Sequence, residues 1–320
     1  MIIRDKNIYL CEKTNNGDVR LLRVYGEYPI VEIPKKLQGY SVTEIGSYCF
    51  APIKKMSSEY RKECEDIERD LPFSYHEIAG KEVNEVILPN TVTTLHSYSF
   101  YNCKELVTLT FGAALNEVNG DSFMNCSHLH RLIVNASVLK PTGVQFLLNQ
   151  LNGEIEVIFK EKKETHILFP EYSETYEEIG PAHIFHLQVE GEGFRARKQF
   201  QNGIFDIRGY DQIFSTAIGR ESTRTLVQMA VMRLCEPIEL DSESRDKYKS
   251  YVKEHEKVLV ETLVKENAEE KILYLCRQNI FSDEGFVFLL QQITAKGWTK
   301  LGAAIIRDKS SHAITSGYSF

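Results

Sequence analysis

The chain has little that marks a membrane protein or a secreted one. It holds one tryptophan among 320 residues, and its apolar runs fall well short of the roughly 18 residues that a membrane-spanning helix needs. The first residues, Met1 to Lys6, include an acid and lack the apolar core of a secretory signal. We therefore expect a cytoplasmic protein without membrane insertion.

Positive charge is also scarce. Lys and Arg number 38 against 45 Asp and Glu, which gives a net charge of −7. Because proteins that bind phosphate backbones usually present a basic face, this balance argues against nucleic acid as a partner. The seven cysteines include no short-spaced pair, so we expect reduced thiols and no metal site.

Sequence motifs of catalysis are missing as well. The chain contains no Gly-x-Ser-x-Gly elbow, no phosphate-binding loop ending in Gly-Lys-Ser/Thr and no His-Glu-x-x-His. We expect neither an enzyme nor a bound cofactor. An enzyme of unrecognised type, with catalytic residues brought together from distant positions, remains an alternative.

What the sequence does have is a 23-residue repeat. Residues 86–106 and 109–129 match at that offset, and both contain Phe-x-Asn-Cys-x-x-Leu. The same offset takes Leu132 and Val134 to Ile155 and Val157, which predicts a further strand. Residues 33–50 look like an earlier unit with five extra residues. Units of this size cannot bury a core alone, so the repeat predicts a stacked solenoid.

The units resemble leucine-rich repeats of the BspA type, also called the treponemal type. That pattern runs Leu-x-x-Ile-x-Ile-Pro, then Val-x-x-Ile, then Phe-x-x-Cys-x-x-Leu, and the resemblance covers roughly residues 20–160. It implies an α/β leucine-rich-repeat solenoid of short parallel strands. We expect Asn102 and Asn125 to lie in turns, and Cys103 and Cys126 to be small buried side chains.

An insertion interrupts the repeat near residues 52–80, where 27 extra residues separate two units. Apolar residues recur there at steps of three and four, which predicts an amphipathic helix near 52–72. The stripe comprises Ile53, Met56, Tyr60, Cys64, Ile67 and Leu71. We expect the helix to lie over the solenoid surface. A separate partner-binding helix is the alternative.

Beyond the solenoid, assigned to residues 1–160, the pattern changes twice. Residues 161–214 keep strand character at 165–170 and 183–189, and we interpret them as degenerate repeats or a β cap. Gly-x-Gly beside two arginines at 191–197 predicts a glycine turn, with a phosphate cradle as the alternative.

The C-terminal third has helical periodicity. We assign residues 215–310 to a helical domain and 311–320 to a flexible tail. A weak offset of 29 suggests stacked helical hairpins, which resemble degenerate ankyrin pairs. The offset pairs Val260 with Leu289, Val264 with Ile293, Ile272 with Leu301, and Cys276 with Ile305.

The candidate binding residues come from the outward positions of the repeat strands. One predicted column holds Glu85, Thr108, Arg131 and Glu154, and the next holds Ile87, Thr110, Ile133 and Glu156. The candidates are Glu85, Ile87, Thr108, Thr110, Arg131 and Ile133. A merely solvated sheet face is the alternative.

These features predict a non-enzymatic scaffold or adaptor that binds a protein partner through this face. The sequence leaves the identity of that partner and the oligomeric state open. Family members with signal peptides are surface proteins that bind host or matrix ligands. Adhesion is therefore the second hypothesis, disfavoured by the missing signal.

Overall fold

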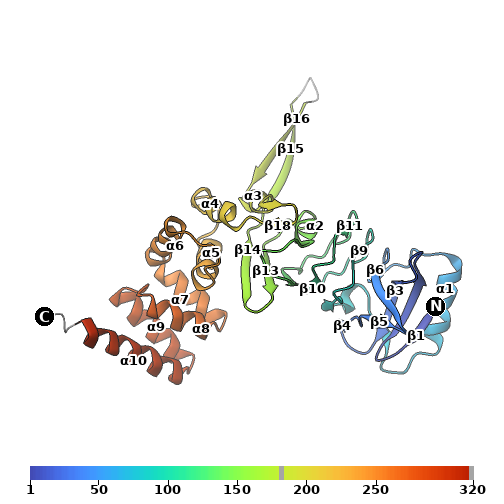
Figure 1. Cartoon of the computed structure of the whole chain (residues 1–320), viewed down its shortest axis with the longest axis horizontal. Helices are drawn as coiled ribbons and strands as arrows, with labels where there is room; N and C mark the ends of the chain where they lie inside the picture. The colour runs from blue at the N-terminus through green and yellow to red at the C-terminus, as the bar shows by residue number, and fades with distance from the viewer. Residues whose placement is uncertain (180–183, 317–320) are drawn as a thin grey trace. The chain divides into compact units, whose positions relative to one another are not determined.

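The computed structural model describes residues 1–179 and 184–316, shown in Figure 1. Two compact units are present. Unit 1 comprises residues 1–165, 171–189 and 193–206, and unit 2 comprises residues 166–170, 190–192 and 207–320. Unit 1 holds the strands of the repeats, and unit 2 holds the helices from Ile207 onward.

Unit 1 begins with three strands that cover the first repeat. β1 (Ile2–Arg4), β2 (Ile8–Lys13) and β3 (Val19–Gly26) pair antiparallel in chain order. β3 then runs parallel to β6 (Tyr40–Ile45). An antiparallel meander thus covers the edge that the first repeat strand would otherwise expose.

The repeats build two sets of parallel strands. One set follows β3-β6-β9-β11, with β9 at Thr94–Leu95 and β11 at Glu117–Val118. The other follows β13-β12-β10-β8-β4, and its strands are β4 (Ile30–Glu32), β8 (Glu85–Ile87), β10 (Thr108–Gly112), β12 (Arg131–Asn135) and β13 (Ile155–Lys160). The predicted leucine-rich-repeat fold with short parallel strands is confirmed.

The register shows where the 23-residue period holds. Val86, Leu109 and Leu132 are partners across β8, β10 and β12, an offset of 23 at each step. Leu132 then pairs with Val157, so the step into β13 is 25 residues and the predicted pairing with Ile155 is wrong. A short helix, α2 (Val144–Leu148), occupies the connection and lengthens it.

The core of the repeats includes a stack of phenylalanine rings. Phe100 stacks on Phe50 with ring centroids 4.9 Å apart and on Phe123 with centroids 5.2 Å apart, both at 8° between planes. Cys103 Sγ donates to the Phe50 carbonyl at 3.2 Å, and Cys126 Sγ donates to the Phe100 carbonyl at 3.0 Å. The cysteines are buried, as predicted, and their thiols also bond each repeat to the one before.

The two asparagines lie in turns as expected. Asn102 has φ of +58° and Asn125 has φ of +64°, in the left-handed region that asparagine tolerates. Asn125 Nδ2 donates to Asn102 Oδ1 at 2.7 Å. The side chains therefore bond to each other across neighbouring repeats.

The insertion forms helix α1 (Ser58–Arg69), which the Ser57 side chain caps. Its buried residues, Cys64 and Ile67, pack against Ile8, Leu10 and Tyr25. The helix therefore covers the N-terminal strands. The remaining short elements of this region are β5 (Lys36–Leu37), β7 (His76–Glu77) and a 3₁₀ turn at Gly80–Glu82.

A buried arginine anchors the start of the insertion. Arg23 on β3 donates to the carbonyls of Cys49, Ala51 and Ile53 at 3.1, 2.6 and 2.6 Å, and its Nε lies 3.2 Å from Glu77. These carbonyls lie where the chain leaves the repeat. The guanidinium supplies hydrogen bonds that the interrupted repeat cannot supply itself.

A glutamine closes the far end of the first strand set. Gln150 Nε2 donates to the carbonyls of Val118 and Asn119 at 3.2 and 2.9 Å, while its Oε1 accepts from the Ser122 N–H at 3.0 Å. Between earlier repeats, a backbone N–H donates to the equivalent carbonyl, as the Asn119 N–H does to the Leu95 carbonyl. The side-chain amide replaces the hydrogen bonds of a further repeat.

The segment after the repeats combines strands with a short helix. Its elements are β14 (Glu164–Phe169), β15 (Ser173–Ile179), β16 (Ile184–Glu190), α3 (Gly193–Ala196), β17 (Phe200–Gln201) and β18 (Ile204–Phe205). His183, the first residue of the predicted strand 183–189, lies outside the described residues. Arg197 is buried, and its guanidinium donates to the carbonyls of Leu151, Gly153 and Gly193. Because internal carbonyls occupy this arginine, the phosphate-cradle alternative loses its support.

Unit 2 contains seven described helices from Ile207 to Ser316: α4 (Ile207–Ala217), α5 (Thr223–Cys235), α6 (Ser242–Glu254), α7 (Glu256–Lys265), α8 (Glu269–Arg277), α9 (Asp283–Ala295) and α10 (Thr299–Ser316). Equivalent turns follow α7 and α9, where Ala268 N–H donates to Leu263 O and Trp298 N–H donates to Ile293 O. The structural offset is thus 30 residues, one more than the sequence suggested.

The predicted flexible tail, 311–320, begins inside a helix. α10 continues to Ser316, and residues 317–320 lie outside the described residues. The helical segment also starts at Ile207, before the predicted boundary at 215. The likeness to ankyrin pairs remains a prediction.

A buried ionic cluster ties three helices of unit 2 together. Arg233 on α5 donates to both oxygens of Asp211 on α4, at 2.7 and 2.9 Å. The Tyr248 hydroxyl on α6 donates to the same carboxylate at 2.8 Å. Arg233 is 1% exposed, so a loss of the carboxylate would leave a buried charge unpaired.

We expect Asp211→Ala to lower the free energy of unfolding of unit 2 by about 3–5 kcal/mol, because it strands the Arg233 charge. Urea unfolding followed by the fluorescence of Trp298 would measure the change. Asp308→Ala is the matched control, since it breaks the more exposed pair with Arg277 and should cost less than about 1 kcal/mol. Equal losses in the two variants would contradict the account.

Candidate functional site

The second strand set places the candidate residues in two rows. Register pairs Ile30, Glu85, Thr108, Arg131 and Glu156 across β4, β8, β10, β12 and β13. The neighbouring row holds Glu32, Ile87, Thr110, Ile133 and Ile158. We call these two rows the strand face. It brings together all six residues that the sequence singled out.

Two predicted members of the strand face are less accessible than expected. Thr108 and Thr110 are only 6% and 8% exposed, whereas Ile87, Arg131 and Ile133 are half-buried. A threonine is short, and each of these two stands between longer side chains on the flanking strands. The accessible part of the face therefore consists of the longer side chains around them.

The far end of the face also differs from the prediction. Glu156, and not Glu154, lies beside Arg131, because the step into β13 is two residues longer than the repeat. Arg131 Nε donates to Glu156 Oε2 at 3.0 Å, so this pair presents a cation and an anion side by side. Ile158 follows Ile133 in the other row and is buried.

The face has an apolar and acidic side at β4. Ile30 is 54% exposed, and Glu32 in the next row is exposed. Ile87 and Glu85 lie beside them on β8 in the opposite order. The strand face therefore alternates isoleucine with carboxylate here, which gives a partner both apolar area and directional hydrogen-bond acceptors.

An aromatic cluster that was not predicted from the sequence lies at the turns after the first strand set. Tyr48 stacks on Tyr98 with centroids 5.0 Å apart, and Tyr101 packs edge-on to both. Tyr48 and Tyr98 have φ of +59° and +62°, as does Asp121 at +57° one repeat later. A hydrogen bond to Asp121 raises the pKa of Tyr98. The sequence pattern that could have revealed the cluster is an offset of 50 residues, which relates Tyr48 to Tyr98 and Phe50 to Phe100.

A charged network lies on the first strand set. Glu44 Oε2 accepts from Arg20 Nε and contacts His96 Nε2, both at 2.7 Å. Burial alone would raise the pKa of Glu44, but the hydrogen bonds with His96 and Arg20 outweigh it and lower that pKa. The carboxylate is thus held ionised as part of the surface structure.

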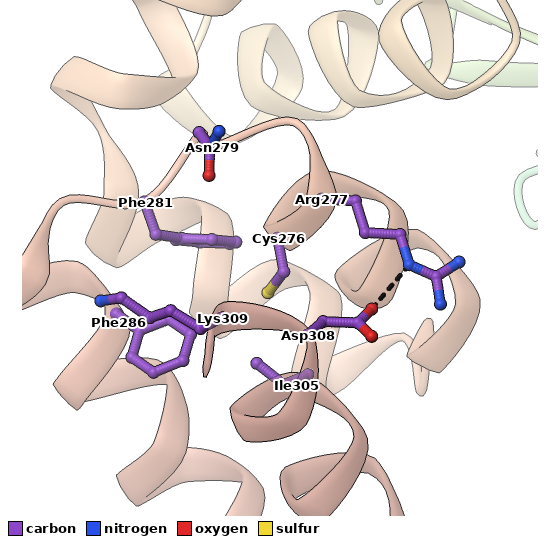
Figure 2. A pocket seen from close by; sticks show the side chains of 8 residues that line it. All are labelled: Cys276, Arg277, Asn279, Phe281, Phe286, Ile305, Asp308 and Lys309. Atoms are coloured by element: carbon purple, nitrogen blue, oxygen red, sulfur yellow. Dashed lines mark hydrogen bonds and ion pairs between the residues drawn. The ribbon is translucent and has the colours of Figure 1, made fainter. Parts of the chain in front are cut away.

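Unit 2 contains a small pocket of about 50 Å³ between α8 and α10 (Figure 2). Its charged groups are already paired, since Arg277 Nε donates to Asp308 at 2.7 Å and Lys309 Nζ lies 2.9 Å from Asp283. Burial raises the pKa of the Cys276 thiol to about 12, so this thiol is protonated at neutral pH. The pocket offers neither a nucleophile nor room for a large substrate.

Among residues 1–179 and 184–316, no group of three or more His, Cys, Asp or Glu side chains is arranged to hold a metal ion. Over the same residues, no helix combines the length and the apolar character that crossing a membrane requires.

Comparison with protein families identifies the repeats. Residues 73–156 match the model described as "BspA type Leucine rich repeat region (6 copies)". This segment is a BspA-type leucine-rich repeat region. The family suggests a protein-binding or surface-adhesion role, and its members are typically without enzymatic activity.

Solved structures of two bacterial leucine-rich proteins are similar to part of this chain at low identity. A T. pallidum leucine-rich repeat protein is 17% identical, with a TM-score of 0.29, over 40% of this chain and 51% of that one. A leucine-rich cell surface protein from Faecalibacterium prausnitzii is 19% identical, with a TM-score of 0.28, over 43% and 33%. This chain thus spans about half of the first and a third of the second. No curated protein matches the chain.

The lowered pKa of Glu44 predicts how unit 1 responds to acid. The contribution of the carboxylate to stability is complete above the ordinary glutamate pKa and is lost as the pH falls through the lower folded value. We expect Glu44→Gln to be less stable than wild type by about 1 kcal/mol at pH 7. The two unfolding curves should begin to converge as the pH falls below about 4.3, the ordinary glutamate pKa.

Circular dichroism during urea unfolding at several pH values would test this, with Glu65→Gln as the control for an exposed glutamate. A stability difference between wild type and Glu44→Gln that stays constant down to the acid limit would show that the carboxylate charge does not matter.

Proposed function

We propose that this chain is a non-enzymatic scaffold or adaptor that binds a protein partner on the strand face. The observation that supports this most directly is the composition of the accessible rows. Half-exposed isoleucines at positions 30, 87 and 133 alternate with charged groups on a rigid parallel sheet. Apolar anchors with a polar surround are typical of protein interfaces.

The accessible residues of the strand face can vary without harming the fold. The inward residues Val86, Leu109 and Leu132 are fully buried and hold the sheet in place. Their half-buried outward neighbours, Ile87, Arg131 and Ile133, contribute less to that core. A repeat scaffold therefore separates the residues that fold the chain from the residues that recognise a partner.

A cytoplasmic location fits the state of the thiols. All seven cysteines are free, five of them buried, and burial raises the pKa of Cys49 and Cys103 well above the usual value. A core built on free thiols suits a reducing compartment. Adhesion at a cell surface is the second candidate, favoured by the repeat family, and cell fractionation distinguishes the two.

The test is to purify the tagged full chain gently from its own cells and to compare wild type with Arg131→Ala/Ile133→Ser. We expect a stoichiometric partner with wild type and at least a tenfold loss with the variant. Both side chains are only half-buried, so the variant should lose about 1 kcal/mol of stability and remain folded.

Arg61→Ala/Ile53→Ser is the matched control, because it removes the same two residue types from the inserted segment. It should keep the partner. A partner retained by the strand-face variant and lost from this control would place recognition on the α1 segment and overturn the proposal. Unfolding of the strand-face variant would show that Arg131 and Ile133 belong to the core.

A further inference from the structure

One element of unit 1 has no obvious structural support. β15 and β16 form a two-stranded sheet of their own, and neither pairs with another of the described strands (Figure 1). We call Ser173–Ile179 and Ile184–Glu190 the acidic hairpin. Every side chain from Ser173 to Glu178 is exposed, and Tyr176 is 65% exposed.

A hairpin with both faces exposed to water lacks the packing that usually stabilises a sheet. A strand in a sheet normally buries one of its two faces, yet residues 173–178 of β15 bury neither. Isolated two-stranded hairpins are at best marginally stable, and a third strand or a packed face usually supports them. Leu187 on β16 adds an apolar side chain that is 40% exposed.

The base of the hairpin, in contrast, is firmly built. The Tyr172 N–H donates to the Asn152 carbonyl at 2.9 Å, and its ring lies 5.6 Å from the ring of Phe194. The buried Arg197 guanidinium lies over the Tyr172 ring, 5.0 Å from its centroid. The hairpin is therefore anchored to unit 1 at the residue before β15. A firm base of this kind lets an exposed hairpin present its surface to a partner.

The charge of the acidic hairpin indicates which class of partner it can bind. Residues 171–190 contain five glutamates and no lysine or arginine. Along β15, Glu174 and Glu178 flank Tyr176 on one face, and Glu177 lies on the other. This surface repels phosphate groups, which disfavours nucleic acids and anionic lipids, and it attracts lysine and arginine side chains.

We propose that the acidic hairpin is a docking arm for an extended, basic segment of another protein, which adds a third strand to it. The open edge of a two-stranded sheet supplies backbone donors and acceptors for strand addition. A strand added to the open edge of β15 places one set of its alternating side chains beside Glu174, Tyr176 and Glu178 and the other set beside Glu177, so lysines on either face meet a carboxylate. This arm is separate from the strand face and does not depend on the function proposed for that face.

The test measures binding of the full chain to a labelled nine-residue peptide of alternating lysine and valine by fluorescence anisotropy. Glu174→Gln/Glu177→Gln should weaken binding at least tenfold, and Glu65→Gln/Glu261→Gln, which removes two exposed glutamates elsewhere, should leave it unchanged. The strand-face variant Arg131→Ala/Ile133→Ser should also bind as wild type does.

A second peptide of alternating lysine and proline separates strand addition from simple charge attraction. It has the same charge spacing, but its prolines lack the N–H groups that a sheet needs, so we expect at least tenfold weaker binding. Equal affinity for both peptides, no binding by wild type, or an equal loss in the control variant would each overturn the proposal. So would a wild-type dimer in sedimentation that the hairpin substitutions dissociate, because a second copy would then be the occupant.

Discussion

Three repeats of unit 1 each contribute one phenylalanine to a stack, and the rest of the unit depends on that contact. Phe50, Phe100 and Phe123 lie nearly parallel, within 4.9 to 5.2 Å of their neighbours. Cysteine thiols bond each repeat to a carbonyl of the repeat before it. Aromatic stacking adds only about 0.5–1.5 kcal/mol per pair beyond burial, but a single repeat is too small to bury a core without its neighbours. The stack therefore sets the spacing at which the strands, and with them the strand face, must lie.

A stack of this kind has two ends, and the chain treats each differently. The β1–β3 meander and helix α1 cover the first end of one strand set, while Gln150 supplies the hydrogen bonds of a missing repeat at the other. Two buried arginines, Arg23 and Arg197, bond to carbonyls where the chain departs from the repeat. These polar groups satisfy backbone carbonyls at the points where an irregular chain enters and leaves a regular core.

The sequence was sufficient to predict features that follow a regular period, namely the strand register and the buried side of a helix. The 23-residue offset gave the β8–β10–β12 register, and the spacing of Cys64 and Ile67 gave the buried side of α1. It could not predict the two extra residues before β13, because a connection that contains α2 has no fixed length. The burial of Thr108 and Thr110 depends on the length of side chains on the neighbouring strands, which alternation along one strand does not report. The contacts of Arg23, Gln150 and Arg197 join distant segments and have no local pattern.

The central claim is that the phenylalanine stack supports the strand face as one cooperative body. Hydrogen exchange of the full chain carrying Phe100→Ala tests it most directly, with Phe73→Ala as the control because Phe73 is fully exposed. The account predicts that amides of β4, β8, β10 and β12 lose protection together, while α5 to α9 in unit 2 keep theirs. Faster exchange confined to residues 93–103, with the neighbouring strands still protected, would contradict it.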